Sequence, residues 1–429
     1  MKIAVIGGGI SGLTCCHYLG SQHEVTLFEK NQYLGGHTHT HQFEQDSQVH
    51  QVDSGFIVFN QKTYPNFCKL LDDLKVPYKP SEMSFSFNCQ ESGLEYNGTT
   101  INTLFAQRKN LFSPRFYALI TGILKFNRKA KQWLKSPDKN QSLGDFLVQS
   151  GISNVTQSDY ILPIGAAVWS TSPRRMVRMP ALFFLHFFEN HGFLNIEDRP
   201  QWQVVSGGSH SYVEALKKNF KGQIHASCPV KAIRRVENHC TVITEQTEEQ
   251  FDKVIFACHS DQALALLEQP TPIEEKILKA IPYEPNTAVI HWDEDVMPNK
   301  PLAWASWNYL RHEKGSQDLC VTYHMNRLQG FESEKPYFVT LNPSKKINQN
   351  KVLKEIIYQH PQFMEESLHA QERWGEINGK NNSYFCGAYW RYGFHEDGVW
   401  SALRVCKEMA SHADRSHAKK LDSGDSIGI

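Results

Sequence analysis

The sequence lacks the features that define several large classes of protein. Its ten cysteines include no C-x-x-C pair, which argues against a zinc site or a redox dithiol. Lys plus Arg and Asp plus Glu both number 45, so no excess charge indicates a nucleic-acid partner. No uncharged apolar run reaches the roughly 18 residues of a membrane-spanning helix. We therefore expect a globular protein with no nucleic-acid partner and no metal ion.

The compartment and the domain count follow from equally simple features. No secretory leader precedes the first expected strand at Lys2, and Cys15 and Cys16 fall inside an expected helix as small apolar residues. These features predict a cytoplasmic protein in a reducing compartment. A chain of 429 residues is too long for one hydrophobic core, so we expect two domains. Residues 413–429 are polar and charged, which predicts a disordered tail.

The N-terminal residues carry a strand, a glycine turn, a helix, a second strand and an acid, in that order. Lys2 to Ile6 is rich in β-branched residues, and G-x-G-x-x-G follows at Gly7, Gly9 and Gly12. The second apolar strand, from Val25 to Phe28, ends at Glu29. This order predicts a dinucleotide-binding site, and the alternative is an ordinary glycine turn.

Each residue type in this motif has a physical role. Gly7 allows a tight turn, Gly9 lets the main chain approach a diphosphate, and Gly12 lets the helix pack closely on the strand. The helix begins near Ser11, where free N–H groups and the positive end of the helix dipole favour an anion. Glu29 can accept both ribose hydroxyls of an adenosine, and its charge disfavours a 2′-phosphate.

A second glycine motif distinguishes FAD from a nicotinamide cofactor. Gly35 and Gly36 follow Glu29 after a short turn. This doublet resembles the second fingerprint of the glutathione-reductase-like FAD proteins, which nicotinamide dehydrogenases do not usually carry. The resemblance implies bound FAD and a cofactor contact at His37, directly after the doublet.

Distant segments resemble later parts of the same FAD-binding domain. Cys228 to Ile233 resembles a strand whose main chain, here at Val230, meets the adenine. Tyr384 to Ala388 is an expected strand and turn, and the resemblance places Gly387 and Ala388 at the diphosphate and the ribityl chain.

The resemblance also assigns a role to the last helix. Its N-terminus, near Asp397 and Val399, points at the flavin C2 oxygen. A helix N-terminus there would stabilise the negative charge of a reduced flavin.

Together these segments resemble the flavin amine oxidase-like family, which includes monoamine oxidases, phytoene desaturases and protoporphyrinogen oxidases. Within that family the chain is most similar to a bacterial group of predicted NAD/FAD-binding proteins. The resemblance implies an α/β fold with a Rossmann-like, glutathione-reductase-like FAD-binding domain and a discontinuous α+β substrate domain. We expect the FAD-binding domain at 1–80, 200–270 and 375–412. The substrate domain is expected at 81–199 and 271–374, mostly helical over 104–200 and with an antiparallel sheet over 285–341.

The implied chemistry is FAD-dependent oxidation, with hydride transfer from the substrate to flavin N5. His395 is the candidate catalytic residue near the pyrimidine end of the flavin, where the alternative is that it tunes the flavin. Trp169, Tyr389 and Trp390 are candidates for the substrate pocket, and the alternative for the last two is packing beneath the flavin.

Two departures from amine oxidases bear on the substrate. Many amine oxidases carry a lysine that positions a water at N5, and the expected strand from Thr287 to Trp292 has none. Some hold the flavin through a cysteine shortly before the last motif, and residues 335–384 have none. We therefore predict non-covalent FAD and an apolar acyl or isoprenoid substrate that undergoes desaturation. The alternatives are an amine oxidase, a non-catalytic FAD-binding redox partner and a flavin-dependent isomerase. No motif names the electron acceptor.

Three further patterns each have two interpretations. Apolar residues recur at helical spacing from Phe116 to Leu134 among many Lys and Arg, which is typical of peripheral membrane contact or of a helix with a solvated basic face. We favour the second. Phe183 to Phe188 either line an apolar channel or belong to the core. His37, His39 and His41 alternate as on a strand, but a cofactor contact explains His37 better than a metal site does.

Overall fold

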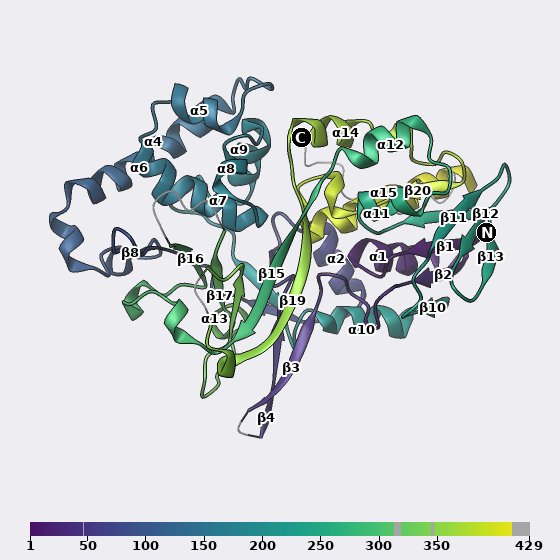
Figure 1. The fold of residues 1–429 in the computed structure, drawn as a ribbon, viewed down its shortest axis with the longest axis horizontal. Helices are drawn as coiled ribbons and strands as arrows, with labels where there is room; N and C mark the ends of the chain where they lie inside the picture. The colour runs from purple at the N-terminus through teal and green to yellow at the C-terminus, as the bar shows by residue number, and fades with distance from the viewer. Residues whose placement is uncertain (46, 313–318, 345–346, 414–429) are drawn as a thin grey trace.

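The N-terminal motif lies at the centre of a parallel sheet (Figure 1). The computed structural model describes residues 1–45, 47–312, 319–344 and 347–413. In it β1 (Lys2–Ile6) pairs in parallel with β2 (Glu24–Phe28) on one side and with β14 (Lys253–Phe256) on the other. β10 (Gln223–His225) and β20 (Ser383–Phe385) complete the order β10-β2-β1-β14-β20. The strand order reverses at β1, and ligands of open α/β sheets bind at the carboxyl ends of strands at such a point.

Helices cover this sheet because its strands are apolar on both faces. α1 (Ile10–Leu19) connects β1 to β2, and the long C-terminal α15 (His395–Ala413) packs beside it (Figure 1). The other helices of this part are α2 (Pro65–Asp73), α10 (His210–Asn219), α11 (Ser260–Leu266), α12 (Pro272–Lys279) and α14 (Glu365–Glu372).

Three smaller sheets complete this half. A hairpin joins β3 (Thr40–Gln45) to β4 (Gln48–Asp53), and it points away from the body of the molecule (Figure 1). The two three-stranded sheets contain β5 (Val58–Asn60), β9 (Trp202–Val205) and β6 (Tyr78–Pro80) in one, and β11 (Ala232–Arg235), β12 (Cys240–Ile243) and β13 (Glu248–Phe251) in the other.

The other half contains a seven-stranded mixed sheet, in the order β19-β15-β18-β17-β16-β7-β8. The sheet expected over 285–341 corresponds to four of these strands, namely β15 (Tyr283–His291), β16 (Trp307–Arg311), β17 (Val321–His324) and β18 (Phe338–Leu341). The sequence analysis missed the other three, which are β7 (Phe85–Cys89), β8 (Leu94–Asn97) and β19 (Val352–Pro361). β16 and β7 run parallel, and the other pairs are antiparallel.

A helical lobe lies beyond this sheet, in the segment expected to be mostly helical (Figure 1). Its longest helix, α4 (Pro114–Trp133), begins where the Ser113 hydroxyl accepts the Phe116 N–H and Pro114 takes the first helical position. The other helices are α3 (Ile101–Leu104), α5 (Leu143–Gln149), α6 (Asn154–Thr156), α7 (Leu162–Trp169), α8 (Pro173–Met176) and α9 (Ala181–Asn190), with the short α13 (Met325–Gln329) on the sheet.

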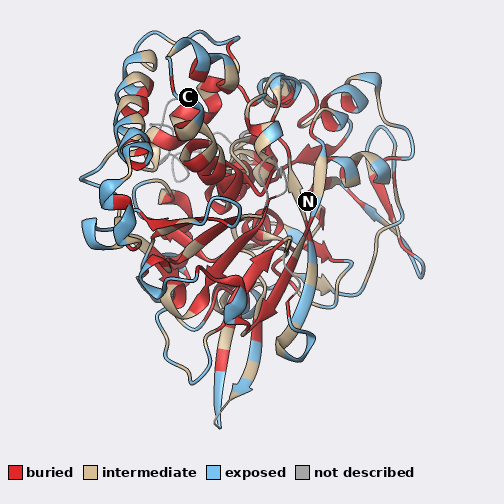
Figure 2. Cartoon of the chain, turned by 60° about the vertical axis from the view of Figure 1, so that its left-hand side comes forward, coloured by how far each residue is buried: buried red, intermediate tan, exposed pale blue. Residues whose placement is uncertain are grey.

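The described residues form two large hydrophobic cores. One lies around the parallel sheet, and the other lies between the mixed sheet and the helical lobe. Figure 2 shows buried residues along the strands of both halves. The first core also includes Ile277, Ile281 and Ala370, outside the expected 1–80, 200–270 and 375–412. The expected domain boundaries stay a prediction, because the two halves of the molecule also contact one another along β15 and β19.

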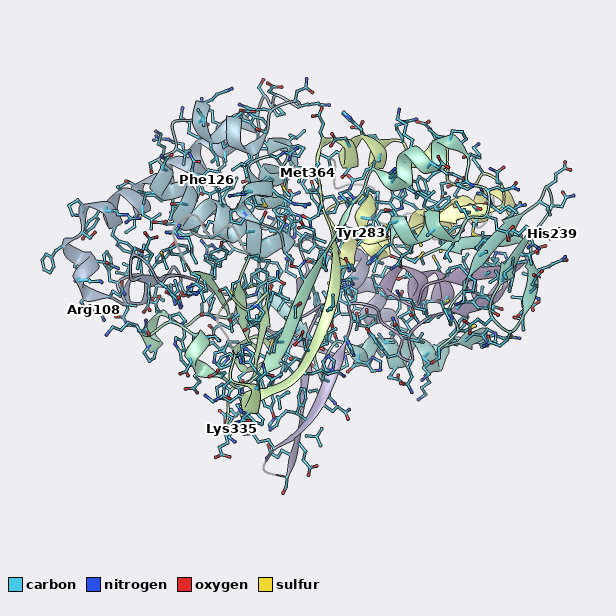
Figure 3. The ribbon with its side chains drawn as sticks, viewed as in Figure 1. Arg108, Phe126, His239, Tyr283, Lys335 and Met364 are labelled. Atoms are coloured by element: carbon cyan, nitrogen blue, oxygen red, sulfur yellow. The ribbon has the colours of Figure 1, made fainter. Side chains whose placement is uncertain are left out.

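Apolar residues of the basic helix pack against the protein. The side chains of Phe116, Leu119, Phe126 and Ala130 are buried in the second core, so the apolar stripe of α4 faces the protein. Figure 3 labels Phe126 inside the helical lobe. Removing a fully buried Phe side chain of this kind costs about 3–5 kcal/mol. This stripe is therefore not a membrane-facing surface.

Two other expectations concern membranes and the tail. Across the described ranges, no helix combines the length and the apolar character that crossing a bilayer requires. The predicted disordered tail at 413–429 lies, apart from its first residue, outside the described residues.

Candidate active site

A cavity of about 1030 Å³ runs from the glycine turn after β1 to the helical lobe. It passes between the parallel sheet and the strands β15 and β19, where Figure 3 labels Tyr283 near the middle of the molecule. Its volume lies at the upper end of the usual range of ligand pockets, roughly 300–1,000 Å³. One end is lined by glycines and polar groups, and the other by aromatic side chains.

The glycine turn leaves open space at the N-terminus of α1, where a diphosphate approaches the helix of a dinucleotide-binding motif. Gly7 has φ of +108°, and a Cβ on Gly12 would lie 1.9 Å from the Gly7 carbonyl oxygen. A Cβ on Gly9 would meet nothing within 4 Å. Gly9 and Ser11 line the cavity at the N-terminus of α1, where main-chain N–H groups favour an anion.

Glu29 is fixed at the edge of this turn. Its carboxylate is buried and accepts the Gly8 N–H and the Asn31 N–H, each at 2.7 Å. A carboxylate has about four lone-pair positions, so both oxygens can still accept ribose hydroxyls. Glu29 lines the cavity at the carboxyl end of β2, as a ribose-binding acid of a dinucleotide fold does.

The second glycine motif packs directly on the first. The Gly35 N–H donates to the Gly8 carbonyl at 2.8 Å, and both Gly35 and Gly36 have positive φ. A Cβ on Gly35 would lie 2.3 Å from the Thr38 carbonyl oxygen, so this tight turn requires glycine. The turn places the His37 side chain in the cavity wall.

The structure brings most of the predicted site residues together around the cavity. Those that line it are Gly7, Gly9, Ser11, Glu29, Gly35, Gly36, His37, Trp169, Val230, Gly387, Ala388, Tyr389 and His395. They come from widely separated parts of the chain, and the parallel sheet and its flanking turns bring them to one edge.

Four predicted residues lie behind this wall. Gly12 packs α1 against Gly7, and Trp390 is buried beside Tyr389 with ring centroids 5.0 Å apart. Asp397 accepts the Phe394 N–H at 2.9 Å and so caps α15, while burial raises its pKa to about 6. Val399 is fully buried. The start of α15 therefore reaches the cavity through Gly393, Phe394 and His395 instead of Asp397 and Val399.

His395 is held tightly by protein groups. Its Nε2 lies 2.8 Å from the Thr38 hydroxyl and 2.9 Å from the Tyr212 hydroxyl, and its ring stacks on Phe56 at 3.6 Å. Burial lowers its pKa well below the usual value, so the imidazole is neutral at neutral pH. An Nε2 that is already engaged and has a low affinity for protons favours the tuning interpretation over a general base.

The far end of the cavity is aromatic. The Trp169 indole N–H donates to the Tyr392 carbonyl at 3.2 Å, and its ring packs on Phe187 at 4.7 Å. Phe187 lines the cavity, whereas the side chains of Phe183, Phe184 and Phe188 are buried in the second core. The Phe183 to Phe188 segment thus contributes to both the channel and the core.

Sequence reasoning missed a second wall. Tyr283 on β15 and Tyr358 and His360 on β19 line the cavity, as does His259 before α11. Tyr358 and His360 belong to a strand that was not expected. His259 follows β14 by three residues, at the edge of the parallel sheet where the glycine turns lie.

The alternating histidines do not converge on one point. His41 Nε2 lies 2.8 Å from the Ser54 hydroxyl, and the His39 and His41 rings are 4.0 Å apart. Within the described ranges, no three His, Cys, Asp or Glu side chains are grouped as metal ligands.

The geometry defines a dinucleotide-binding protein, since the glycine turns, Glu29 and the open space over Gly9 all fit a bound dinucleotide. Residues 10–330 match the family described as flavin containing amine oxidoreductase, and the chain belongs to this family. The predicted family, α/β fold class and flavin cofactor are thereby confirmed.

Individual relatives have diverse chemistry. The chain is 42% identical over 262 residues to the flavin-dependent L-tryptophan oxidase RebO of Lentzea aerocolonigenes, covering 56% of this chain and 54% of that protein. It is 60% identical over 37 residues to 4,4'-diapophytoene desaturase of Staphylococcus aureus strain Newman, which covers 8% of this chain and 7% of that one. These matches span about half, or less, of the relatives' length.

The fold extends over nearly the whole chain. The solved structure of cyclohexylamine oxidase from Brevibacterium oxydans IH-35A superposes with a TM-score of 0.68 at 13% identity, covering 96% of this chain and 99% of that one. At this identity the likeness concerns the fold alone.

Paired glycine substitutions separate packing from cofactor binding. Gly12→Ala forces a Cβ against the Gly7 carbonyl and should lower the Tm of the FAD-free protein, because overpacking costs about 1–3 kcal/mol. Gly9→Ala meets no protein atom and should leave that Tm unchanged, yet raise the Kd for FAD at least about tenfold. Thermal unfolding and fluorescence titration measure the two effects.

The control for this pair is Gly375→Ala, whose Cβ also meets nothing within 4 Å but lies outside the cavity lining. It should change neither quantity. Unaltered FAD binding by Gly9→Ala would show that the diphosphate does not approach this turn.

Proposed function

We propose that the chain is an FAD-dependent oxidoreductase that oxidises an apolar substrate, with FAD bound non-covalently. The observation that carries this proposal is the single cavity that joins the glycine turns to the aromatic end at Trp169. When bound, FAD accepts a hydride at N5. The chain's own groups orient the two reactants and exclude water.

The far half of the cavity suits an apolar chain. Its lining is mostly aliphatic or aromatic, with Ser84, Thr99, Ser170 and Arg199 as polar members. The apolar members from the helical lobe and the mixed sheet include Tyr96, Tyr160, Ile164, Ala167, Val168, Trp169, Phe187, Phe193, Trp307 and Tyr323. Among the residues described, Lys30 and Arg199 are the cations that line the cavity. Lys30 adjoins Glu29 at the cofactor end, and Arg199 is an exposed residue near Tyr160. A substrate carboxylate in the aromatic part would therefore have Arg199 as its cationic partner among the described lining residues.

The amine-oxidising alternative lacks a matching feature. β15 carries no lysine, and Lys300 is not among the residues that line the cavity. Oxidation of an amine or an amino acid is nevertheless the second candidate, because RebO is named an L-tryptophan oxidase. The diapophytoene desaturase match accords with an apolar substrate. A flavin-dependent isomerase and a non-catalytic redox partner are the remaining alternatives.

An anaerobic substrate panel tests the proposal. An acyl lipid should bleach the flavin absorbance faster than any simple amine or L-amino acid. Each methylene buried in the aromatic end contributes about 0.8 kcal/mol, so half-saturation should fall roughly fourfold per added methylene until the cavity is full. Rapid bleaching by an amine or by L-tryptophan, with no response to acyl lipids, would contradict it and support the second candidate.

The helical lobe also carries a surface suited to peripheral membrane contact. Ile101 and Phe112 are 79% and 88% exposed, and Arg108 and Lys109 lie between them in sequence. Figure 3 labels Arg108 at the end of the molecule farthest from the parallel sheet. Thr99, two residues before Ile101, lines the cavity, so an apolar substrate could enter from a lipid surface there.

Vesicle binding tests this surface. The protein should bind vesicles that contain anionic lipid, and binding should fall with added salt. Phe112→Ser should weaken binding several-fold, because it removes an exposed aromatic side chain that lipid would bury. Val148→Ser, at a position on α5 that is 73% exposed, is the matched control and should have no effect. Equal binding to neutral and anionic vesicles, or no binding to either, would show that this surface is not an anionic-membrane contact.

A further inference from the structure

Three imidazoles gather in the cavity wall beside the N-terminus of α1. His37 follows the glycine doublet, which packs on the first glycine turn, and its ring centroid lies 5.3 Å from that of His360 and 6.2 Å from that of His259. These side chains come from three distant parts of the chain, and all line the cavity. The N-terminus of α1 is also where the diphosphate of a dinucleotide binds.

A chain of amide groups fixes the proton of His360. The Thr287 main-chain N–H donates to Asn342 Oδ1 at 2.9 Å, so Asn342 Nδ2 donates to Asn286 Oδ1 at 2.6 Å. Asn286 Nδ2 is then the donor to His360 Nδ1 at 2.9 Å. Because a main-chain N–H can only donate, the orientation of each amide follows from it. His360 is therefore neutral, with its proton on Nε2 and its Nδ1 blocked against protonation.

His37 has the opposite arrangement. Its Nε2 is buried and has no hydrogen-bond partner within the described residues. The Gln359 main chain favours the protonated ring and offsets part of the effect of burial on its pKa. Within the described residues no donor blocks Nε2 as Asn286 blocks Nδ1 of His360, so Nε2 can take up a proton. His259 likewise has a buried Nδ1 with no partner in the described part of the chain. Such unsatisfied buried nitrogens indicate a missing polar ligand.

The surroundings of His37 contain few other charges. The titratable and charged groups that face it or its neighbours come from five elements. They are Tyr358 and His360 on β19, Tyr283 on β15, Cys258, His259 and Asp261 after β14, Glu29 and Lys30 after β2, and His395 on α15. Burial lowers the pKa of His37 to about 4, so without an anion its ring is neutral at pH 7. A nearby dianion would favour the protonated ring.

We propose that His37, His259 and His360 hold the diphosphate of FAD, with His360 as a fixed neutral donor and His37 as the group that takes up one proton when FAD binds. The inference rests on the proposed flavin function and adds to it a proton that couples FAD affinity to pH. His37 was expected to contact the cofactor, and the roles of His259, His360 and the proton go beyond that expectation.

The pH dependence of FAD release from the full-length holoprotein tests the proposal. Diluted holoprotein releases FAD, whose fluorescence gives the Kd between about pH 5.5 and pH 8.5, a window in which FAD itself has no titrating group. Uptake of one proton makes the Kd rise with pH by up to about tenfold per pH unit below the pKa of His37 in the complex. A Kd that does not change with pH would overturn the proposal even if no variant folds.

Matched variants assign the proton. His37→Gln should abolish the slope, with a Kd above the wild-type value near pH 6 and close to it near pH 8.5. His360→Leu should weaken FAD binding at every pH by several-fold. It should keep the slope, because the imidazole of His360 stays neutral in the wild-type protein and takes up no proton. His39→Gln, outside the cavity lining, should change neither quantity. A slope that persists in His37→Gln, or disappears in His360→Leu, would contradict the assignment. A purified protein that contains no FAD would instead contradict the proposed flavin function.

Discussion

The contact between Gly12 and Gly7 is the constraint on which the rest of the site depends. A Cβ on Gly12 would lie 1.9 Å from the Gly7 carbonyl oxygen, so α1 starts closer to the end of β1 than any residue with a side chain at position 12 would allow. This close approach aims the N-terminus of α1 at the cavity and leaves open space over Gly9. Glu29, the glycine doublet and the start of α15 are all positioned relative to that turn, because they pack on α1 or on the strands beside β1.

The second wall of the cavity depends on two long strands. β15 and β19 pair over most of their length, and they run from the mixed sheet to the parallel sheet (Figure 1). They bring Tyr283, Tyr358 and His360 to the glycine turns while their other ends belong to the second core. The same pair of strands therefore links the cofactor end of the cavity to its aromatic end.

The local parts of this site were predictable from the sequence. The glycine turns, Glu29 and the strands around them depend on short-range geometry that only glycine or an acid at that spacing provides. β19 was missed because it has no clear apolar alternation, and Ile357 in its middle is 64% exposed. The stripe of α4 was recognised as apolar, but periodicity does not say whether protein or lipid covers it. Asp397 and Val399 stay predicted cofactor contacts, and the residues at the start of α15 that line the cavity are Gly393, Phe394 and His395. The sequence does not show which residue of α15 faces the cavity.

Release of the cofactor by acid tests the central claim most directly. The purified protein should be yellow, and acid precipitation should leave a colourless pellet and about one FAD per chain in the supernatant, because the cavity offers a single glycine-lined end to the dinucleotide. A pellet that stays yellow after washing would show a covalent flavin. A supernatant without FAD would show that this cavity is not built for that cofactor.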